Sequence, residues 1–291
     1  MNQIKTIGII GAGQMGGGIA QVAAVAGFKA LIFDTTSGAL GRCQDAHQKR
    51  LKREVEKARM TEQAMNAALN HLHYVESLDM LKGVDIVIEA VVEDIKIKRE
   101  LFAHLARMFP GNQILASNTS SISITEIAAA ADQAVKDSGH RVIGMHFFNP
   151  VPIMKLVEVI KGIQTAKDTT DRTIELAKAL GKTPIPANDR PGFISNRVLM
   201  PMINEAFYAW MEGVAEPAHL DEIMKLGCNF PMGPLRLADF IGLDTCAFIM
   251  NVLAEGLNND RYRPCPLLKQ LVAAGRLGDK TGRGVFEYPK T

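Results

Sequence analysis

Residues 7–24 read IGIIGAGQMGGGIAQVAA, and this stretch decides the first half of the fold. The apolar run Ile7–Ile10 is typical of a buried strand, and Ile19–Ala24 has the composition of a helix. In such a strand–turn–helix unit the first glycine permits a tight turn, the second lets the backbone approach a pyrophosphate, and the third allows the helix to pack on the strand. The N–H groups at the start of the helix attract phosphate charge. We therefore predict a dinucleotide-binding turn, with cofactor contacts from Gly11, Gly13, Gln14, Met15 and Gly16.

A second apolar run, Ala30–Phe33, ends on Asp34, about 20 residues beyond the glycines. An acid at this position hydrogen-bonds the hydroxyls of an adenosine ribose. Its charge opposes a 2′-phosphate, and no arginine occurs in Thr35–Ser37 to offset that charge. The sequence therefore predicts NAD rather than NADP.

The composition is that of a soluble globular protein, with 47% hydrophobic and 22% charged residues in 291. A formal charge of +2 gives no reason to expect nucleic acid or a membrane as partner. No apolar stretch approaches the ~20 residues that cross a bilayer, and the first strand starts too early to leave room for a cleaved targeting peptide. The four cysteines are widely spaced, which favours reduced, mostly buried thiols over disulfides or zinc. We expect a cytoplasmic bacterial protein with no metal site.

Strands and helices alternate over the first part of the chain. Residues 37–72 are charged and free of proline, which predicts one or two helices longer than an ordinary crossover. Further strands are expected at 84–92, 113–117, 141–146, 156–160 and 183–186, and a helix at 169–180 ending at Gly181. Because several of these runs are apolar on both faces, we predict a mostly parallel sheet covered on both sides.

A proline-rich linker, Pro184 to Gly192, precedes a region without strand-like runs. Helices are expected there at 196–211, 219–226, 234–257 and 266–274, and Pro201 predicts a kink or a delayed start in the first. The region holds more apolar residues than a small bundle needs, which favours a homodimer interface. The sequence thus predicts an α/β domain over 1–188, with its helical excursion at 37–72, and an all-helical domain over 189–291.

His146 follows a predicted strand, at the edge where open α/β sheets gather ligands. Imidazole is the side chain best suited to take a hydroxyl proton near neutral pH during hydride transfer. Glu158 ends the next apolar segment, and a carboxylate on the second ring nitrogen would fix the tautomer and favour the imidazolium. A lone histidine after a strand is more often structural, but the polar, proline-rich sequence around His146 favours the catalytic interpretation.

Two further polar clusters are expected at this edge. Ser117–Ser121 follows a strand and offers hydroxyls and an amide to a nicotinamide or a substrate oxygen, although such residues are also common helix caps. Asn196 starts the helical region and could hydrogen-bond the reacting oxygen, with a surface cap as the simpler alternative. Only the combination of these clusters with His146 favours a catalytic site.

At this point the chain resembles the NAD-dependent L-3-hydroxyacyl-CoA dehydrogenases. The matching stretches run from end to end: GAGQMGGGIA at 11–20, IEAVVED at 88–94, SNTSS at 117–121, HFFNPVPIMKLVEVI at 146–160, RPGFISNR at 190–197, KLGCNFPMGPLRLADFIGLD at 225–244 and KTGRGVFEY at 280–288. The resemblance implies a Rossmann-type domain followed by a helical substrate and dimerisation domain. It also implies catalytic or substrate-contacting roles for His146, Glu158, Ser120, Asn149 and Asn196, and cofactor contacts for Asp34, Glu93, Lys98, Asn118 and Ser120.

The family's acyl-CoA substrate needs a site for its nucleotide end. The basic run 49–59 suits the phosphates of coenzyme A, and we choose Arg50 and Lys57 as contacts, the alternative being a solvated charged face. The loosely patterned segment 128–139 is expected to be a surface loop. The expected reaction interconverts a short L-3-hydroxyacyl-CoA and its 3-ketoacyl-CoA with NAD. The alternatives are a dehydrogenase of small hydroxy or sugar acids, as in gulonate-type relatives, and a non-catalytic NAD-binding protein.

Overall fold

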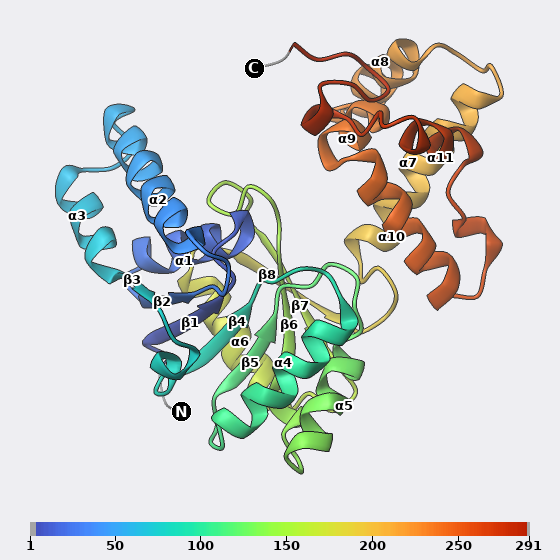
Figure 1. Ribbon diagram of the computed structural model, residues 1–291. Helices are drawn as coiled ribbons and strands as arrows, with labels where there is room; N and C mark the ends of the chain where they lie inside the picture. The colour runs from blue at the N-terminus through green and yellow to red at the C-terminus, as the bar shows by residue number, and fades with distance from the viewer. Residues whose placement is uncertain (1–3, 290–291) are drawn as a thin grey trace. The chain divides into compact units, whose positions relative to one another are not determined.

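The computed structural model describes residues 4–289, and the chain divides into two compact units between Asp189 and Arg190 (Figure 1). The first unit is built on a sheet of strand order β3-β2-β1-β4-β5-β6-β7-β8. Its strands are β1 (Thr6–Ile10), β2 (Lys29–Phe33), β3 (Leu72–Val75), β4 (Ile86–Glu89), β5 (Ile114–Ser117), β6 (Val142–Phe147), β7 (Leu156–Lys161) and β8 (Thr183–Asn188). The expected mostly parallel sheet is confirmed.

One pairing differs from the parallel pattern. In the part of the sheet with the order β3-β2-β1-β4-β5-β6, every pair of neighbouring strands is parallel. The strand β7 runs antiparallel to β6 and is parallel to β8. Glu158 therefore lies in the middle of β7 and directly opposite His146, rather than at the end of its segment as expected from the sequence. This reversal brings together two residues that the sequence separates.

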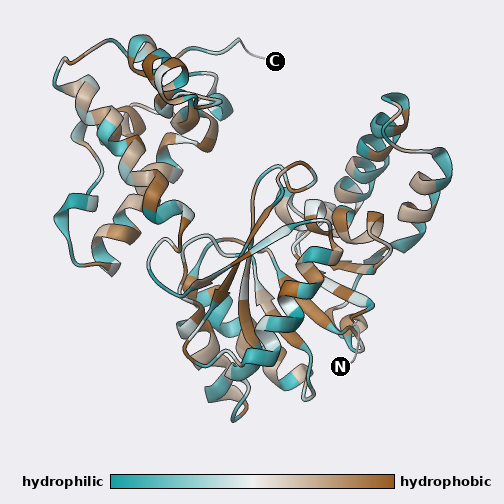
Figure 2. Ribbon diagram, turned by 180° about the vertical axis from the view of Figure 1, so that it is seen from behind, coloured by the Kyte–Doolittle hydropathy of each residue, from teal (hydrophilic) through white to brown (hydrophobic). Residues whose placement is uncertain are grey.

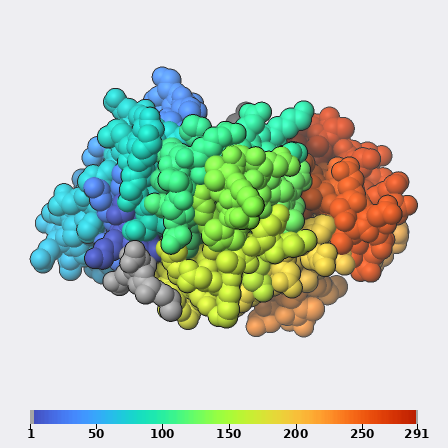
Figure 3. All heavy atoms as spheres, turned by 90° about the horizontal axis from the view of Figure 1, so that it is seen from below, coloured from blue at the N-terminus to red at the C-terminus, as the bar shows by residue number. Residues whose placement is uncertain are grey.

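Helices cover both faces of the sheet (Figure 1). They are α1 (Gln14–Val25), α2 (Ala39–Glu56), α3 (Glu62–His71), α4 (Ile95–Met108), α5 (Ile124–Ala134) and α6 (Lys167–Ala179). In Figure 1, α4 and α5 lie on the near face of the sheet and α6 on the far face. The view from below shows the green region that includes α5 and the yellow-green region that includes α6 at the surface of this unit (Figure 3).

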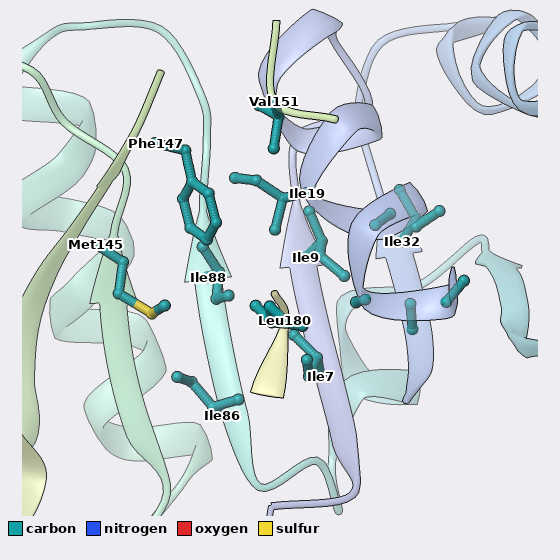
Figure 4. Packing of buried hydrophobic residues seen from close by; sticks show 14 of the residues in the cluster. Ile7, Ile9, Ile19, Ile32, Ile86, Ile88, Met145, Phe147, Val151 and Leu180 are labelled. Atoms are coloured by element: carbon teal, nitrogen blue, oxygen red, sulfur yellow. The ribbon is translucent and has the colours of Figure 1, made fainter. Parts of the chain in front are cut away.

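The core on the α1 and α6 face joins residues from the whole first unit. Ile7, Ile9 and Ile88 on the strands pack with Ile19 on α1 and with Leu180 just after α6 (Figure 4). These side chains are at most 4% exposed, and burial of each contributes roughly 1.5–3 kcal/mol. The core thereby holds the strand ends, and the turns that follow them, in fixed positions.

The second unit is helical, with α7 (Ser195–Met211), α8 (Pro217–Cys228), α9 (Pro234–Ile241), α10 (Leu243–Gly256) and α11 (Pro266–Ala273). It has its own core around Phe207, Leu235 and Met250. No single helix among the described residues has the length and apolar character to cross a membrane. In the described part of the chain, one pair of helices, α9 and α10, passes this test when the two are taken together, and they are bent by 97° relative to each other.

Two expectations from the sequence are wrong. The expected surface loop at 128–139 is largely the helix α5, because Ala128 and Ala131 are fully buried and allow close packing beside α4. The expected single helix over 234–257 is two helices, because Gly242 adopts a φ of +104° that ends α9 and turns the chain.

Candidate active site

The carboxyl ends of the parallel strands carry most of the predicted site of the first unit. The glycine turn follows β1, Asp34 follows β2, Ser117 ends β5, and His146 is the last residue but one of β6. Ligands of open α/β sheets bind outside this edge, where the strand order reverses. Here β2 and β3 lie on one side of β1 and β4 lies on the other, so the strand order reverses beside β1, whose carboxyl end carries the glycine turn.

The glycine turn has the geometry that a dinucleotide needs. Gly11 has a φ of +105°, and a Cβ there would lie 2.5 Å from the carbonyl oxygen of Ala90. A Cβ on Gly16 would lie 1.8 Å from the carbonyl oxygen of Gly11, so only glycine lets α1 pack this closely on the turn. Within residues 4–289, nothing lies within 4 Å of such an atom on Gly13, and no side chain caps α1. The helix start is therefore open to a phosphate group, and the residues present fit the cofactor.

The carboxylate of Asp34 is held by the turn it serves. Its Oδ2 accepts from the backbone N–H of Ala12 at 2.7 Å, and its Oδ1 accepts from that of Thr36 at 2.7 Å. Burial works to raise the pKa of Asp34, but these hydrogen bonds and the charge of Arg42 outweigh it and lower the pKa. Asp34 is therefore ionised at neutral pH and suited to accept from ribose hydroxyls. Arg42 on α2 adds a positive charge near this carboxylate. It lies outside Thr35–Ser37, the segment in which the sequence analysis looked for an arginine.

His146 and Glu158 form a buried hydrogen-bonded pair across β6 and β7. The Nδ1 of His146 lies 2.8 Å from Oε2 of Glu158, and the two residues are only 8% and 1% exposed. With Nδ1–H donating to the carboxylate, the neutral ring carries its lone pair on Nε2. The ring of Phe148 packs beside the imidazole at a centroid distance of 4.5 Å. The pair thus holds a base with one defined tautomer.

Two asparagines connect the segments beside His146, one to the strand β6 and the other to the glycine turn. The side-chain oxygen of Asn118 accepts from the backbone N–H of Phe147 at 2.9 Å. The side-chain oxygen of Asn149 accepts from Nε2 of Gln14 at 2.9 Å, which connects the segment after β6 to the glycine turn. Both asparagines therefore lie within the network that surrounds the histidine.

Glu93 organises the turn that carries Ser120. Its Oε1 accepts from the hydroxyl of Thr119 at 2.6 Å, from the backbone N–H of Ser120 at 2.9 Å and from that of Ser121 at 3.1 Å. Burial works to raise the pKa of Glu93, but the charge of Lys98 and the donors of this turn outweigh it and lower the pKa. Glu93 is therefore an anionic anchor for the serine turn, whatever further contact it makes with a cofactor.

Lys98 lies beneath this turn rather than at its surface. The side chain is 1% exposed, and Nζ lies 2.5 Å from Oε1 of Glu89 and 3.4 Å from Oε2 of Glu93. Glu89, which the sequence analysis did not single out, also accepts from the hydroxyl of Ser117 at 2.6 Å. The sequence offered one signal for this pair, because Glu89 is an acid at the end of an apolar strand and lies nine residues before Lys98. A direct contact between Lys98 and the cofactor stays a prediction.

A cavity of about 890 Å³ lies between α1, α2 and the segment after β6, entirely within the first unit. Arg50 and Lys57 line it, as do residues that the sequence analysis did not choose: Arg53, Arg59, Lys155 and Lys182. Glu54 is the one acidic residue among the described residues of its lining. Val22, Leu51 and Leu180 contribute apolar wall. The outer part of α2 is strongly hydrophilic (Figure 2). The cavity therefore combines an apolar wall with cations suited to a phosphorylated ligand.

Asn196 belongs to the second unit. It lies in the first turn of α7 and is 8% exposed, so it is not the exposed surface cap of the simpler alternative. The helix α7 starts at Ser195 and continues through Pro201, so the delayed start that Pro201 suggested does not occur.

Comparison with known proteins identifies the family. Residues 6–190 match the family described as 3-hydroxyacyl-CoA dehydrogenase, NAD binding domain, and residues 192–288 match its C-terminal domain. The chain is 52% identical to a probable 3-hydroxybutyryl-CoA dehydrogenase of Bacillus subtilis over 98% of each chain. It is 50% identical to the 3-hydroxybutyryl-CoA dehydrogenase of Bradyrhizobium diazoefficiens, over 98% of this chain and 96% of that protein.

The same relationship holds for solved structures. The crystal structure of (S)-3-hydroxybutyryl-CoA dehydrogenase from Ralstonia eutropha has a TM-score of 0.94 and 48% sequence identity, over 99% of this chain and all of the other. These matches do not favour either a sugar-acid dehydrogenase or a non-catalytic NAD-binding protein. The family match and the glycine turn agree on NAD as the cofactor. The chain belongs to the family of NAD-dependent 3-hydroxyacyl-CoA dehydrogenases.

Proposed function

We propose that this protein interconverts (S)-3-hydroxybutyryl-CoA and acetoacetyl-CoA, with His146 as the acid–base residue. The observation that carries this proposal is the buried pair of His146 and Glu158, 2.8 Å apart, at the sheet edge beside the serine turn. The short-chain preference is supported by relatives of 44–52% identity that are named for the four-carbon substrate.

The chemistry divides between the cofactor and the side chains. NAD supplies the acceptor for the hydride that leaves carbon 3 of the alcohol. In oxidation, Nε2 of His146 takes the proton of the 3-hydroxyl, and the carboxylate of Glu158 stabilises the imidazolium that forms. In the reverse direction the same imidazolium returns the proton. Ser120 and Asn196 are proposed to hydrogen-bond the oxygen whose charge changes, and Asn149 to hold the segment after His146 in place.

The basic cavity is proposed to bind the nucleotide end of coenzyme A. Its lining contains six basic side chains and one acidic one, and its volume suits a ligand of nucleotide size. Phosphate groups pair strongly with guanidinium and ammonium groups, whereas the apolar wall suits an adenine ring. A free 3-hydroxy acid would leave this cavity unused.

A substitution pair on α2 and at its C-cap, Lys57, tests this function. Arg50→Gln combined with Lys57→Gln should raise KM for acetoacetyl-CoA about tenfold or more, because hydrogen bonds to charged groups contribute ~1.5–3 kcal/mol each. The matched control is Lys49→Gln with Lys52→Gln, on the same helix but outside the cavity lining. The Kd for NADH should stay unchanged in both. Equal kcat/KM of the wild-type protein for acetoacetyl-CoA and free acetoacetate would contradict the proposed substrate.

We also propose a cytoplasmic homodimer that forms through the helical unit. Large apolar side chains of that unit are exposed, including Val198 at 67%, Val214 at 69% and Leu226 at 77%. Surfaces of this kind on soluble proteins commonly mark protein contacts. Sedimentation equilibrium should give twice the chain mass of 31.7 kDa, and a mass of one chain at micromolar concentration would reject the dimer.

A further inference from the structure

Lys182 is a buried lysine whose hydrogen bonds do not belong to the sheet. It directly precedes β8 and is 8% exposed. Its Nζ donates to the backbone carbonyl of Val151 and, at 2.8 Å, to that of Met154. Both carbonyls belong to the segment Asn149–Lys155, which joins β6 to β7 and is called the connecting loop below. Burial of an ammonium group costs free energy unless the group is well paired, so we expect a role of this charge beyond its contacts with the two carbonyls.

The connecting loop touches the parts of the site that must act together. It starts three residues after His146. Asn149 accepts from the side chain of Gln14 in the glycine turn, at 2.9 Å. Val151 packs so closely on α1 that a Cβ on Gly18 would lie 2.8 Å from the Cβ of Val151 (Figure 4). A shift of this loop would therefore be transmitted to both the histidine strand and the glycine turn.

The connecting loop also forms a wall of the basic cavity. Pro150, Pro152, Ile153 and Lys155 line the cavity, and so does Lys182 itself. An ammonium carries three N–H groups, and two of them serve the loop carbonyls. The third can serve an oxygen acceptor of a ligand in the cavity. Burial and the charge of Lys155 lower the pKa of Lys182, so an anionic ligand would relieve the electrostatic cost of keeping this lysine charged.

We propose that Lys182 is a positioning residue that couples occupancy of the basic cavity to the placement of the connecting loop, and through it to His146. The inference rests on the proposed binding of coenzyme A in this cavity. Binding of the nucleotide end then does more than hold the substrate, because part of its binding energy orders the reacting centre and appears in kcat. Without this coupling, Lys182 would only stabilise the position of the connecting loop, whether or not the cavity is occupied.

The two roles are separated by two substrates with the same reacting group. Acetoacetyl-CoA fills the cavity, whereas S-acetoacetyl-N-acetylcysteamine lacks the nucleotide. Lys182→Met keeps the length of the side chain but removes its donors. This variant should lower kcat for acetoacetyl-CoA by about 10- to 100-fold, since small misplacements of reacting groups have effects of this size. It should leave kcat for the truncated thioester within about twofold, because that substrate cannot use the coupling.

The controls distinguish the possible failures. Lys178→Met, on the exposed face of α6 and outside the cavity, should change neither substrate's kinetics. An equal loss of kcat on both substrates would show that Lys182 only stabilises the loop. A change in KM alone would show that Lys182 only contacts the ligand. Either result overturns the coupling. If the wild-type protein shows no advantage for acetoacetyl-CoA over the truncated thioester, the proposed function fails instead, and the inference fails with it.

A measurement on the wild-type protein keeps the proposal testable if Lys182→Met does not fold. Coenzyme A alone, which cannot react, should slow hydrogen exchange of the connecting-loop amides in the wild-type protein. Lys182→Arg, which keeps the charge and several donors, should retain part of this protection. Unchanged exchange of residues 149–155 in wild-type protein saturated with coenzyme A would overturn the coupling.

Discussion

Two buried carboxylates, Glu158 in the first unit and Asp239 in the second, lie against different kinds of partner. In the first unit, Glu158 lies against a titratable side chain, the imidazole of His146. In the second unit, Asp239 is 1% exposed and accepts from the backbone N–H groups of Val285 and Phe286 at 2.8 and 2.9 Å. The first arrangement can exchange a proton with a substrate, whereas the second ties the C-terminal segment to α9. For these two carboxylates, the partner decides whether the buried charge serves chemistry or architecture.

The largest expected effect tests the chemical side of this comparison. His146→Gln should lower kcat by about 10²- to 10⁴-fold, the usual contribution of a general base, while the unfolding temperature and the Kd for NADH stay close to wild type. Steady-state kinetics, thermal unfolding and NADH fluorescence titration measure these three quantities. Near wild-type turnover in folded His146→Gln would place the base elsewhere.

Glu158→Gln sharpens the same test because it removes the charge but keeps the size. It should lose part of the factor lost by His146→Gln and move the acid limb of the oxidation profile to lower pH, since the imidazolium loses its counter-charge. The double variant should lose much less than the product of the single losses, because both residues serve one proton transfer. Independent, multiplying losses would contradict a shared role.

The next effect tests the architectural side. Asp239→Asn replaces one of the two acceptor oxygens by a donor, which then faces either the N–H of Val285 or the N–H of Phe286 and the hydroxyl of Tyr288. Leaving a buried donor unsatisfied costs about 1–3 kcal/mol, so the free energy of unfolding should fall by this amount in urea denaturation. The kcat of the folded fraction should remain near wild type. Asp260→Asn, whose side chain is 83% exposed in a surface ion pair, is the matched control and should change stability by less than ~0.5 kcal/mol.

Local patterns predicted much of the fold and the site, because each pattern is a short-range requirement. The glycine turn, Asp34 and the strands that end on polar residues are all readable within a few neighbouring positions. The pairing direction of β7 is not, since an apolar run such as 156–160 has the same pattern in either direction. The turn at Gly242 was missed for a similar reason, because apolar periodicity continues on both sides of it.

The connecting loop and the cavity show a second limit of sequence reasoning. Arg50 and Lys57 are recognisable as part of a basic run, but Lys155 and Lys182 are isolated in the sequence and reach the cavity only through the packing of β7 and β8. The prediction of a surface loop at 128–139 was wrong for a different reason, because alanines give a weak hydrophobic pattern although they pack closely in α5. Long-range pairing and small buried residues therefore account for what the sequence could not reveal.

Glu93 stands between the two cases of the comparison and provides the smallest expected effect. It accepts from backbone N–H groups, as Asp239 does, yet its turn carries the proposed catalytic Ser120. Its pKa in the folded protein lies below the ordinary value of 4.5. A carboxyl with a depressed folded pKa contributes stability above its unfolded pKa and loses that contribution as the pH falls through the folded pKa.

Glu93→Gln should therefore remove part of the acid sensitivity of the protein. In the wild type, the unfolding temperature should start to fall as the pH drops below about 5, where the unfolded chain begins to take up the proton that folded Glu93 resists. In Glu93→Gln the curve should start lower at neutral pH and be flatter below pH 5. Glu126→Gln, a half-exposed residue of the same unit, is the matched control and should keep the wild-type slope. If the two variants have equal slopes, Glu93 is not an ionised anchor, and the serine turn is then held by the neutral hydrogen bonds of Thr119 and Ser121 among themselves.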